Sequence, residues 1–126
     1  MPHTQFHSKF RLFSGPLGPN GSLGALAAEV EAFAAKAKAA PKSIGVEYLE
    51  HDKRVVLSLG YRDDEPGYGI KLTSMSLGKI ESFQPEEIAR LETKMGEAAG
   101  KLKDILCHEL MVTAENEFIM VFMTKV

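Results

Sequence analysis

The chain has 126 residues, of which 44% are hydrophobic and 25% are charged, a composition typical of a folded globular protein. Its formal net charge of -2 provides no broad positive field, which argues against nucleic acid as a partner. No apolar run approaches the ~20 residues of a membrane span, and the first residues lack a basic and then apolar signal segment. We therefore expect no membrane partner and a cytoplasmic location.

A single cysteine, Cys107, excludes a disulfide within the chain and an all-cysteine zinc site. This cysteine usage fits a reducing compartment. At this length we expect one domain, residues 1–126. No spacing of residues in the chain matches a known phosphate or metal loop, so we predict no cofactor and no metal site.

The first half of the chain has the pattern of a strand, a helix and a hairpin. Apolar and polar residues alternate over residues 7–13, which predicts a strand. A glycine- and proline-rich loop follows, and apolar residues spaced by three and four from Leu23 to Phe33 predict a helix that Pro41 ends. Alternation then resumes over residues 44–49 and 55–61, which predicts a hairpin.

The second half repeats this pattern. A strand is predicted over residues 70–80, with a bulge between Leu72 and Met75, where its apolar parity shifts. Pro85, followed by two glutamates, begins a helix whose apolar positions again step by three and four. A second hairpin is predicted over residues 106–113 and 117–125.

The order strand, helix, hairpin therefore occurs twice, in similar halves of about residues 4–62 and 68–126. We predict an α+β fold of order βαββ-βαββ, in which about six antiparallel strands form one sheet and both helices pack on one face. This order resembles the duplicated strand-helix-strand-strand arrangement of the effector-binding domains related to the gyrase-inhibitory and SOUL proteins. The resemblance implies small-molecule binding and carries no functional residue over to this chain.

The last predicted strand is apolar on both faces over residues 118–123. One face can meet the helices, so the other face needs a cover. A ligand, a second subunit, or burial as a central strand within the monomer would each provide that cover.

We predict a non-catalytic module that binds a small amphipathic ligand on an open face of the sheet. Acidic side chains would contact a cation and basic side chains an anion, and both contacts strengthen in a cleft shielded from water. His7 lies on the polar side of the first predicted strand, together with Lys9 and Arg11. The expected ligand-binding residues are Lys9, Arg11, Glu47, Tyr61, Tyr68, Glu109, Met120 and Phe122.

Two alternatives stay open. The same apolar face could be a homodimer interface in an interaction subunit that has no ligand, or the protein could be a small cofactor-free enzyme with Glu47, Glu109 or His108 as general base. Cys107 and His108 are neighbours on a predicted strand, so their side chains point to opposite faces and cannot form a dyad. We assign no catalytic residue, and we expect His108 in the core because it shares the apolar side of its strand.

Overall fold

The computed structural model describes residues 8–126, so His7 and the start of the first half at residue 4 lie outside the described residues. Within them the helices and strands follow the predicted βαββ-βαββ order, with one short 3-10 turn before the first helix. The elements are β1 (Ser8–Pro16), η1 (Pro19–Gly21), α1 (Gly24–Ala37), β2 (Ala40–Leu49), β3 (Arg54–Arg62), β4 (Ile70–Lys79), α2 (Pro85–Gly100), β5 (Ile105–Val112) and β6 (Glu117–Lys125).

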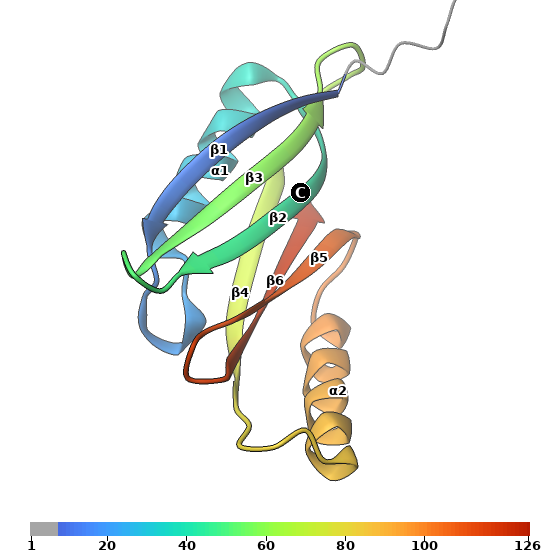
Figure 1. Cartoon of the computed structure of the whole chain (residues 1–126). Coiled ribbons are helices and arrows are strands. Elements are labelled where there is room, and N and C mark those ends of the chain that lie inside the picture. Colours follow the sequence, from blue (N-terminus) through green and yellow to red (C-terminus); the bar gives the residue numbers. More distant parts are fainter. Residues whose placement is uncertain (1–7) are drawn as a thin grey trace, which may run out of the picture.

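The six strands form two antiparallel sheets of three strands, where the sequence suggested one sheet of six. Sheet A has the order β1-β3-β2, and sheet B has the order β4-β6-β5. Figure 1 shows the strands of sheet A crossing in front of those of sheet B, with β2 next to β5. The two sheets therefore meet where an edge strand of one half lies beside an edge strand of the other.

Helix α1 packs between the two sheets and closes the main core. Its buried side chains are Leu26, Val30 and Ala34, and they meet apolar side chains from the inner faces of both sheets. Polar contacts also tie α1 to the edge strand β4, because the carboxylate of Glu31 accepts the Leu72 N–H at 2.8 Å. Besides the helix residues, this core contains Phe13, Leu23, Ile44, Val55, Leu57, Leu59, Ile70, Leu72, Met111, Ile119, Val121 and Met123.

Helix α2 covers the opposite face of sheet B and forms a second, smaller core. Leu91 and Ala98 are the buried residues of α2, and Figure 1 shows this helix far from α1, at the other end of the molecule. The two helices therefore lie on opposite faces of sheet B, whereas the sequence analysis placed both on one face. The second core contains Leu77, Ile80, Leu91, Ala98, Phe118, Met120 and Phe122.

Strand β6 contributes to both cores. Its odd-numbered apolar residues face α1 and sheet A, and its even-numbered ones face α2. Met120 is 3% exposed and Phe122 is 2% exposed. The expected open face of the last strand is therefore wrong: this is a central strand, enclosed within its own chain, and neither residue is available to a ligand.

The end of α1 and the position of the bulge in β4 differ from those predicted. Lys38 adopts the left-handed conformation with φ 52°, and its N–H bonds the carbonyls of Ala34 and Ala35, so the helix ends there and not at Pro41. Pro41 lies within β2, where an edge strand tolerates its missing N–H. The bulge in β4 falls between Ser76 and Gly78, later than predicted.

Among residues 8–126, no helix has both the length and the apolar character that crossing a bilayer requires.

Loss of the Phe122 ring should lower the free energy of unfolding much more than loss of the exposed Phe10 ring. We expect Phe122→Ala to cost about 3–5 kcal/mol, because it opens a cavity in the second core. Phe10 is 72% exposed, so Phe10→Ala should change stability by less than about 0.5 kcal/mol. Urea denaturation followed by circular dichroism measures both, and equal losses in the two variants would contradict the burial of β6.

Candidate functional site

The two basic residues of the expected site, Lys9 and Arg11, contact other residues of sheet A and α1. Lys9 forms an ion pair with Asp63 at 2.6 Å, and the hydrogen bond from Lys9 holds the pKa of Asp63 below its ordinary value. Arg11 places its guanidinium 4.7 Å from the centre of the Phe33 ring on α1. Both side chains are therefore engaged on the face of sheet A that carries α1.

The two tyrosines of the expected site also make contacts within the chain. Tyr61 packs its ring on Phe33, with the ring centres 5.3 Å apart. The Tyr68 hydroxyl donates a hydrogen bond to the carbonyl of Pro41, and the ammonium groups of Lys42 and Lys125 lie over its ring. These contacts fix the segment between β3 and β4.

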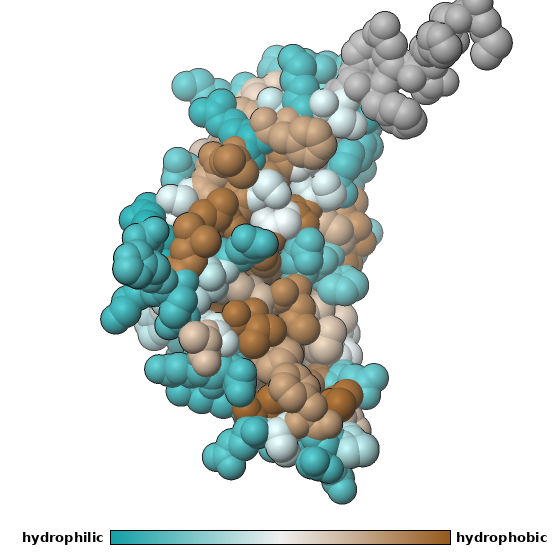
Figure 2. Space-filling view, in the orientation of Figure 1, coloured by the Kyte–Doolittle hydropathy of each residue, from teal (hydrophilic) through white to brown (hydrophobic). Residues whose placement is uncertain are grey.

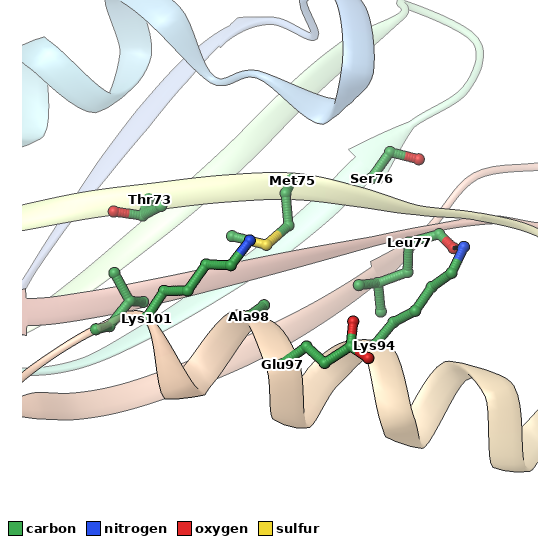
Figure 3. Close-up of a pocket in the computed structure, with 9 residues that line it drawn as sticks. Thr73, Met75, Ser76, Leu77, Lys94, Glu97, Ala98 and Lys101 are labelled. Carbon is green, nitrogen blue, oxygen red and sulfur yellow. Dashed lines mark hydrogen bonds between the residues drawn. The ribbon is translucent and has the colours of Figure 1, made fainter.

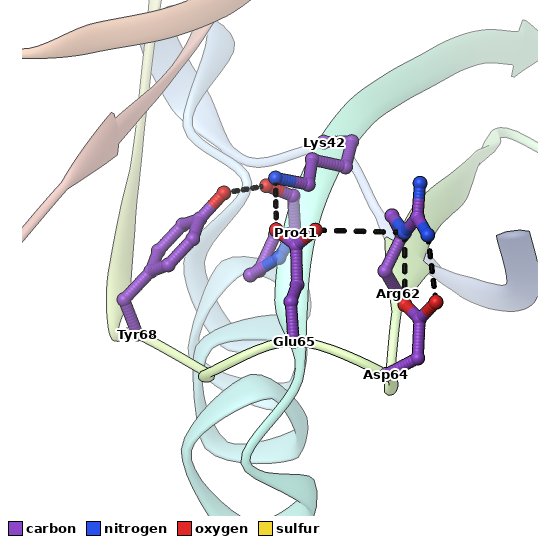
Figure 4. A network of polar contacts seen from close by, with 6 residues as sticks. All are labelled: Pro41, Lys42, Arg62, Asp64, Glu65 and Tyr68. Atoms are coloured by element: carbon purple, nitrogen blue, oxygen red, sulfur yellow. Dashed lines mark hydrogen bonds and ion pairs between the residues drawn. The ribbon is translucent and has the colours of Figure 1, made fainter. Parts of the chain in front are cut away.

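A network of charged side chains holds the same segment, as Figure 4 shows. Arg62 bonds both carboxylate oxygens of Asp64 and lies 3.5 Å from Glu65. Glu65 in turn forms an ion pair with Lys42 at the start of β2. The acidic run after β3 therefore pairs with cations of sheet A and ties the segment between β3 and β4 to that sheet. We call these ion pairs, together with that of Lys9 and Asp63, the clasp.

Glu47 and Glu109 are the two predicted site residues that the structure brings together. Glu47 lies on β2, paired in register with Val56, so it projects from the face of sheet A opposite α1. Glu109 lies on β5, the neighbouring edge strand of sheet B. Both line one hollow of about 380 Å³, whose other walls are Leu12, Gly45, Val46, Val56 and Ser58.

The hollow exists because the residues at its base, Gly45 and Ser58, are small. Gly45 and Ser58 are partners across β2 and β3. A Cβ added at Gly45 would lie 2.9 Å from the Ser58 hydroxyl oxygen, too close for an undisturbed contact. Glycine at this position therefore keeps the space above the sheet free.

A second hollow of about 270 Å³ continues along the same line between β2 and β5. It shares Val46 and Glu47 with the first, and its other walls are Tyr48, Leu110, Met111 and Val112. We call the two hollows together the seam groove. Glu47 lines both hollows, and Glu109 lines only the first.

An exposed apolar side chain lies at the edge of the seam groove on the sheet A side. Leu12, which lines the groove, is 71% exposed. Leu110 and Val112 of β5 are 38% and 44% exposed, and their side chains point to the face of β5 opposite Glu109. Figure 2 shows apolar surface gathered over both sheets on this side of the molecule, with polar residues between. The groove therefore offers negative charge flanked by surface that gains from being covered.

Neither Glu47 nor Glu109 forms an ion pair with any described residue. Most other carboxylates near strand ends of sheet A, by contrast, are paired in the clasp described above. Two carboxylates that share one recess without a counter-charge attract a cation more strongly than the same groups on an open surface.

Cys107 lies beside the seam and is half-buried. Burial raises the pKa of its thiol, a backbone hydrogen bond from Ile44 opposes this shift, and the negative charge of Glu109 adds to it. The thiol is therefore protonated at neutral pH and is a poor nucleophile.

His108 is exposed on the other face of β5, where its ring centre lies 6.5 Å from that of Phe122. The expectation of a core histidine is wrong, because the neighbouring apolar residues of β5 on that face are themselves exposed. Within residues 8–126 no three His, Cys, Asp or Glu side chains cluster as a metal site would require.

Comparison of the chain with protein-family models, with curated proteins and with solved structures gave no match.

Leu12, Val46 and Val56 are groove residues that the sequence analysis missed. Their period-two pattern marks them as strand residues, but it does not say that sheet A leaves one face uncovered. The contact between β2 and β5 brings Glu47 close to Glu109. The pattern of residues in one sequence does not predict that these two strands lie side by side.

The reactivity of Cys107 should report the charge of Glu109. At pH 8 we expect iodoacetamide to alkylate Cys107 more slowly than free cysteine, because a raised pKa leaves less thiolate. Glu109→Gln should speed this alkylation, whereas Glu29→Gln on the exposed side of α1 should not. Mass spectrometry of timed samples measures the rates, and equal rates in both variants would show that Glu109 does not act on the thiol.

Proposed function

We propose that this protein is a non-catalytic module that binds a small organic cation with an apolar body in the seam groove. The observation that carries the proposal is the convergence of Glu47 and Glu109, one from each half, in a recess without an ion-pair partner among the described residues. The cation would lie between the carboxylates, whose negative charges both attract it.

The walls of the groove support an amphipathic ligand in particular. Leu12, Val46 and Val56 flank the acidic hollow. A volume of about 380 Å³ for the acidic hollow falls in the roughly 300–1,000 Å³ range of small-molecule pockets. An apolar group that covers these side chains would add hydrophobic stabilisation to the charge contact.

Two further expectations of the sequence analysis concern the charge of the ligand and the location of the protein. Lys9 and Arg11, which would have favoured an anion, have partners of their own on the other side of sheet A. We therefore propose a cationic ligand and not an anionic one. A cytoplasmic location remains part of the proposal, and it rests on the single cysteine of the chain.

Tetraphenylphosphonium, an apolar organic cation, tests this function directly. We expect it to bind the wild-type chain in isothermal titration calorimetry, and triphenylphosphine oxide, a neutral analogue, to bind much more weakly. Glu47→Gln and Glu109→Gln should each weaken binding about tenfold or more, because each removes one charged contact.

Glu29→Gln is the matched control, since it removes the same charge from the exposed side of α1. It should leave the affinity for tetraphenylphosphonium unchanged. The proposal fails if the neutral analogue binds as well as the cation, or if the control variant loses as much affinity as the groove variants.

A second candidate function is self-association through sheet B, without a small ligand. It is favoured by the exposed apolar side chains on β5 and near the start of α2: Phe83, Ile88, Ile105, Leu106, Leu110 and Val112. An uncovered apolar face of this kind is typical of protein interfaces.

Light scattering with mass analysis at two protein concentrations tests this candidate. If sheet B is a dimer interface, the wild-type chain should have the mass of a dimer, and Leu110→Lys should have that of a monomer. Leu12→Lys places the same charge on sheet A and should leave the dimer intact. A monomer mass for the wild-type chain at both concentrations would rule this function out.

A further inference from the structure

A second groove lies between α2 and β4, on the face of sheet B opposite the main core. Its volume is about 480 Å³. Met75 and Leu77 line it from β4, Ala98 lines it from α2, and Leu102 lines it from the residues that follow α2. Figure 3 shows the small Ala98 side chain facing β4 across this space, which is what leaves it open.

The bulge in β4 shapes one end of the groove. The register pairs Ser76 with Ile119 and Gly78 with Phe118, so Leu77 is the extra residue. Gly78 adopts φ +98°, a conformation that favours glycine. The carbonyl of Leu77 accepts a hydrogen bond at 3.0 Å from the ammonium of Lys94, which spans the groove from α2.

The rim of the groove carries a net positive charge. Lys94 and Lys101 contribute two ammonium groups, and Glu97 contributes one carboxylate. Figure 3 shows both lysine side chains reaching from α2 towards β4, with Lys101 ending near Met75. Lys101 forms no ion pair with any described residue, so its charge is available to a ligand.

An apolar trough with an unpaired cation at one end fits an anion that carries an alkyl chain. The chain would lie along Met75, Ala98 and Leu102, and the anionic head would meet Lys101. Methionine suits this role because its unbranched thioether adapts to the shape of a flexible chain. The Thr73 hydroxyl, which also lines the groove, can donate a hydrogen bond to a ligand.

We propose that the groove between α2 and β4 binds a medium-chain monocarboxylate, with its carboxylate at Lys101 and its alkyl chain over Ala98. This site lies outside the seam groove and takes ligands of the opposite charge. Lys94 holds the rim together through the Leu77 carbonyl, and Lys101 supplies the contact that selects for the anion.

Calorimetric titration of the full chain with decanoate, below its micelle concentration, tests the proposal. We expect decanoate to bind, decanol to bind at least about tenfold more weakly because it lacks the charge, and acetate to show no binding because it lacks the chain. Lys101→Gln should weaken decanoate binding about fivefold or more. Lys103→Gln removes an equal charge from an exposed position two residues away and should have no effect.

Ala98→Leu is the blocking variant, because a larger side chain fills the trough. It should abolish decanoate binding. If it fails to fold, the methyl resonance of ¹³C-labelled Met75 in the wild-type chain replaces it, and this resonance should shift as decanoate is added. The proposal is overturned if decanoate does not bind, if Lys103→Gln weakens binding as much as Lys101→Gln, or if neither the blocking variant nor the Met75 resonance responds.

The seam-groove variants separate this site from the proposed function. Glu47→Gln and Glu109→Gln should leave decanoate binding intact, and Lys101→Gln should leave binding of tetraphenylphosphonium intact. A decanoate affinity that changes in the glutamate variants would show that decanoate does not bind at the groove proposed here, whatever the result with the cation.

Discussion

The apolar side chains on both faces of β6 hold this structure together. Ile119, Val121 and Met123 meet α1 and sheet A, and the alternate residues meet α2. Because a strand presents successive side chains to opposite sides, β6 joins the two cores along its whole length, and β4 also supplies residues to both. The positions of the sheets, and with them of both grooves, depend on this double packing.

Both grooves lie along the edge of a sheet, where the edge strand has no hydrogen-bonded neighbour strand on one of its sides. The seam groove follows β2 and β5, each the edge of its own sheet, and the other groove follows β4 where α2 stands beside it. Their charges are opposite: Glu47 and Glu109 at the seam, lysines at α2. Edge strands are natural binding places, since their side chains are less completely enclosed than those of central strands.

The sequence predicted the order of elements, the second hairpin and the two-sided apolar character of residues 118–123. It did not predict which partner covers each face, because periodicity reports the direction of side chains and not the neighbour they meet. Met120 and Phe122 were therefore placed in a binding site although they belong to a core. Glu47 and Glu109, which the sequence analysis expected on one face with Lys9 and Arg11, line one hollow, whereas Lys9 and Arg11 lie on the face of sheet A that carries α1. Strand parity alone does not say which face carries α1.

The central place of β6 in sheet B also constrains the order in which the chain can fold. Sheet A and α1 use only residues 8–62, and β2 and β3 pair through a short hairpin, so every strand of this sheet is present before the second half begins. Strands β4 and β5 have no ladder between them and are joined only through β6. Sheet B must therefore wait for its last strand, and until that strand arrives the inner surface of the first half stays open to water, a state prone to misassembly.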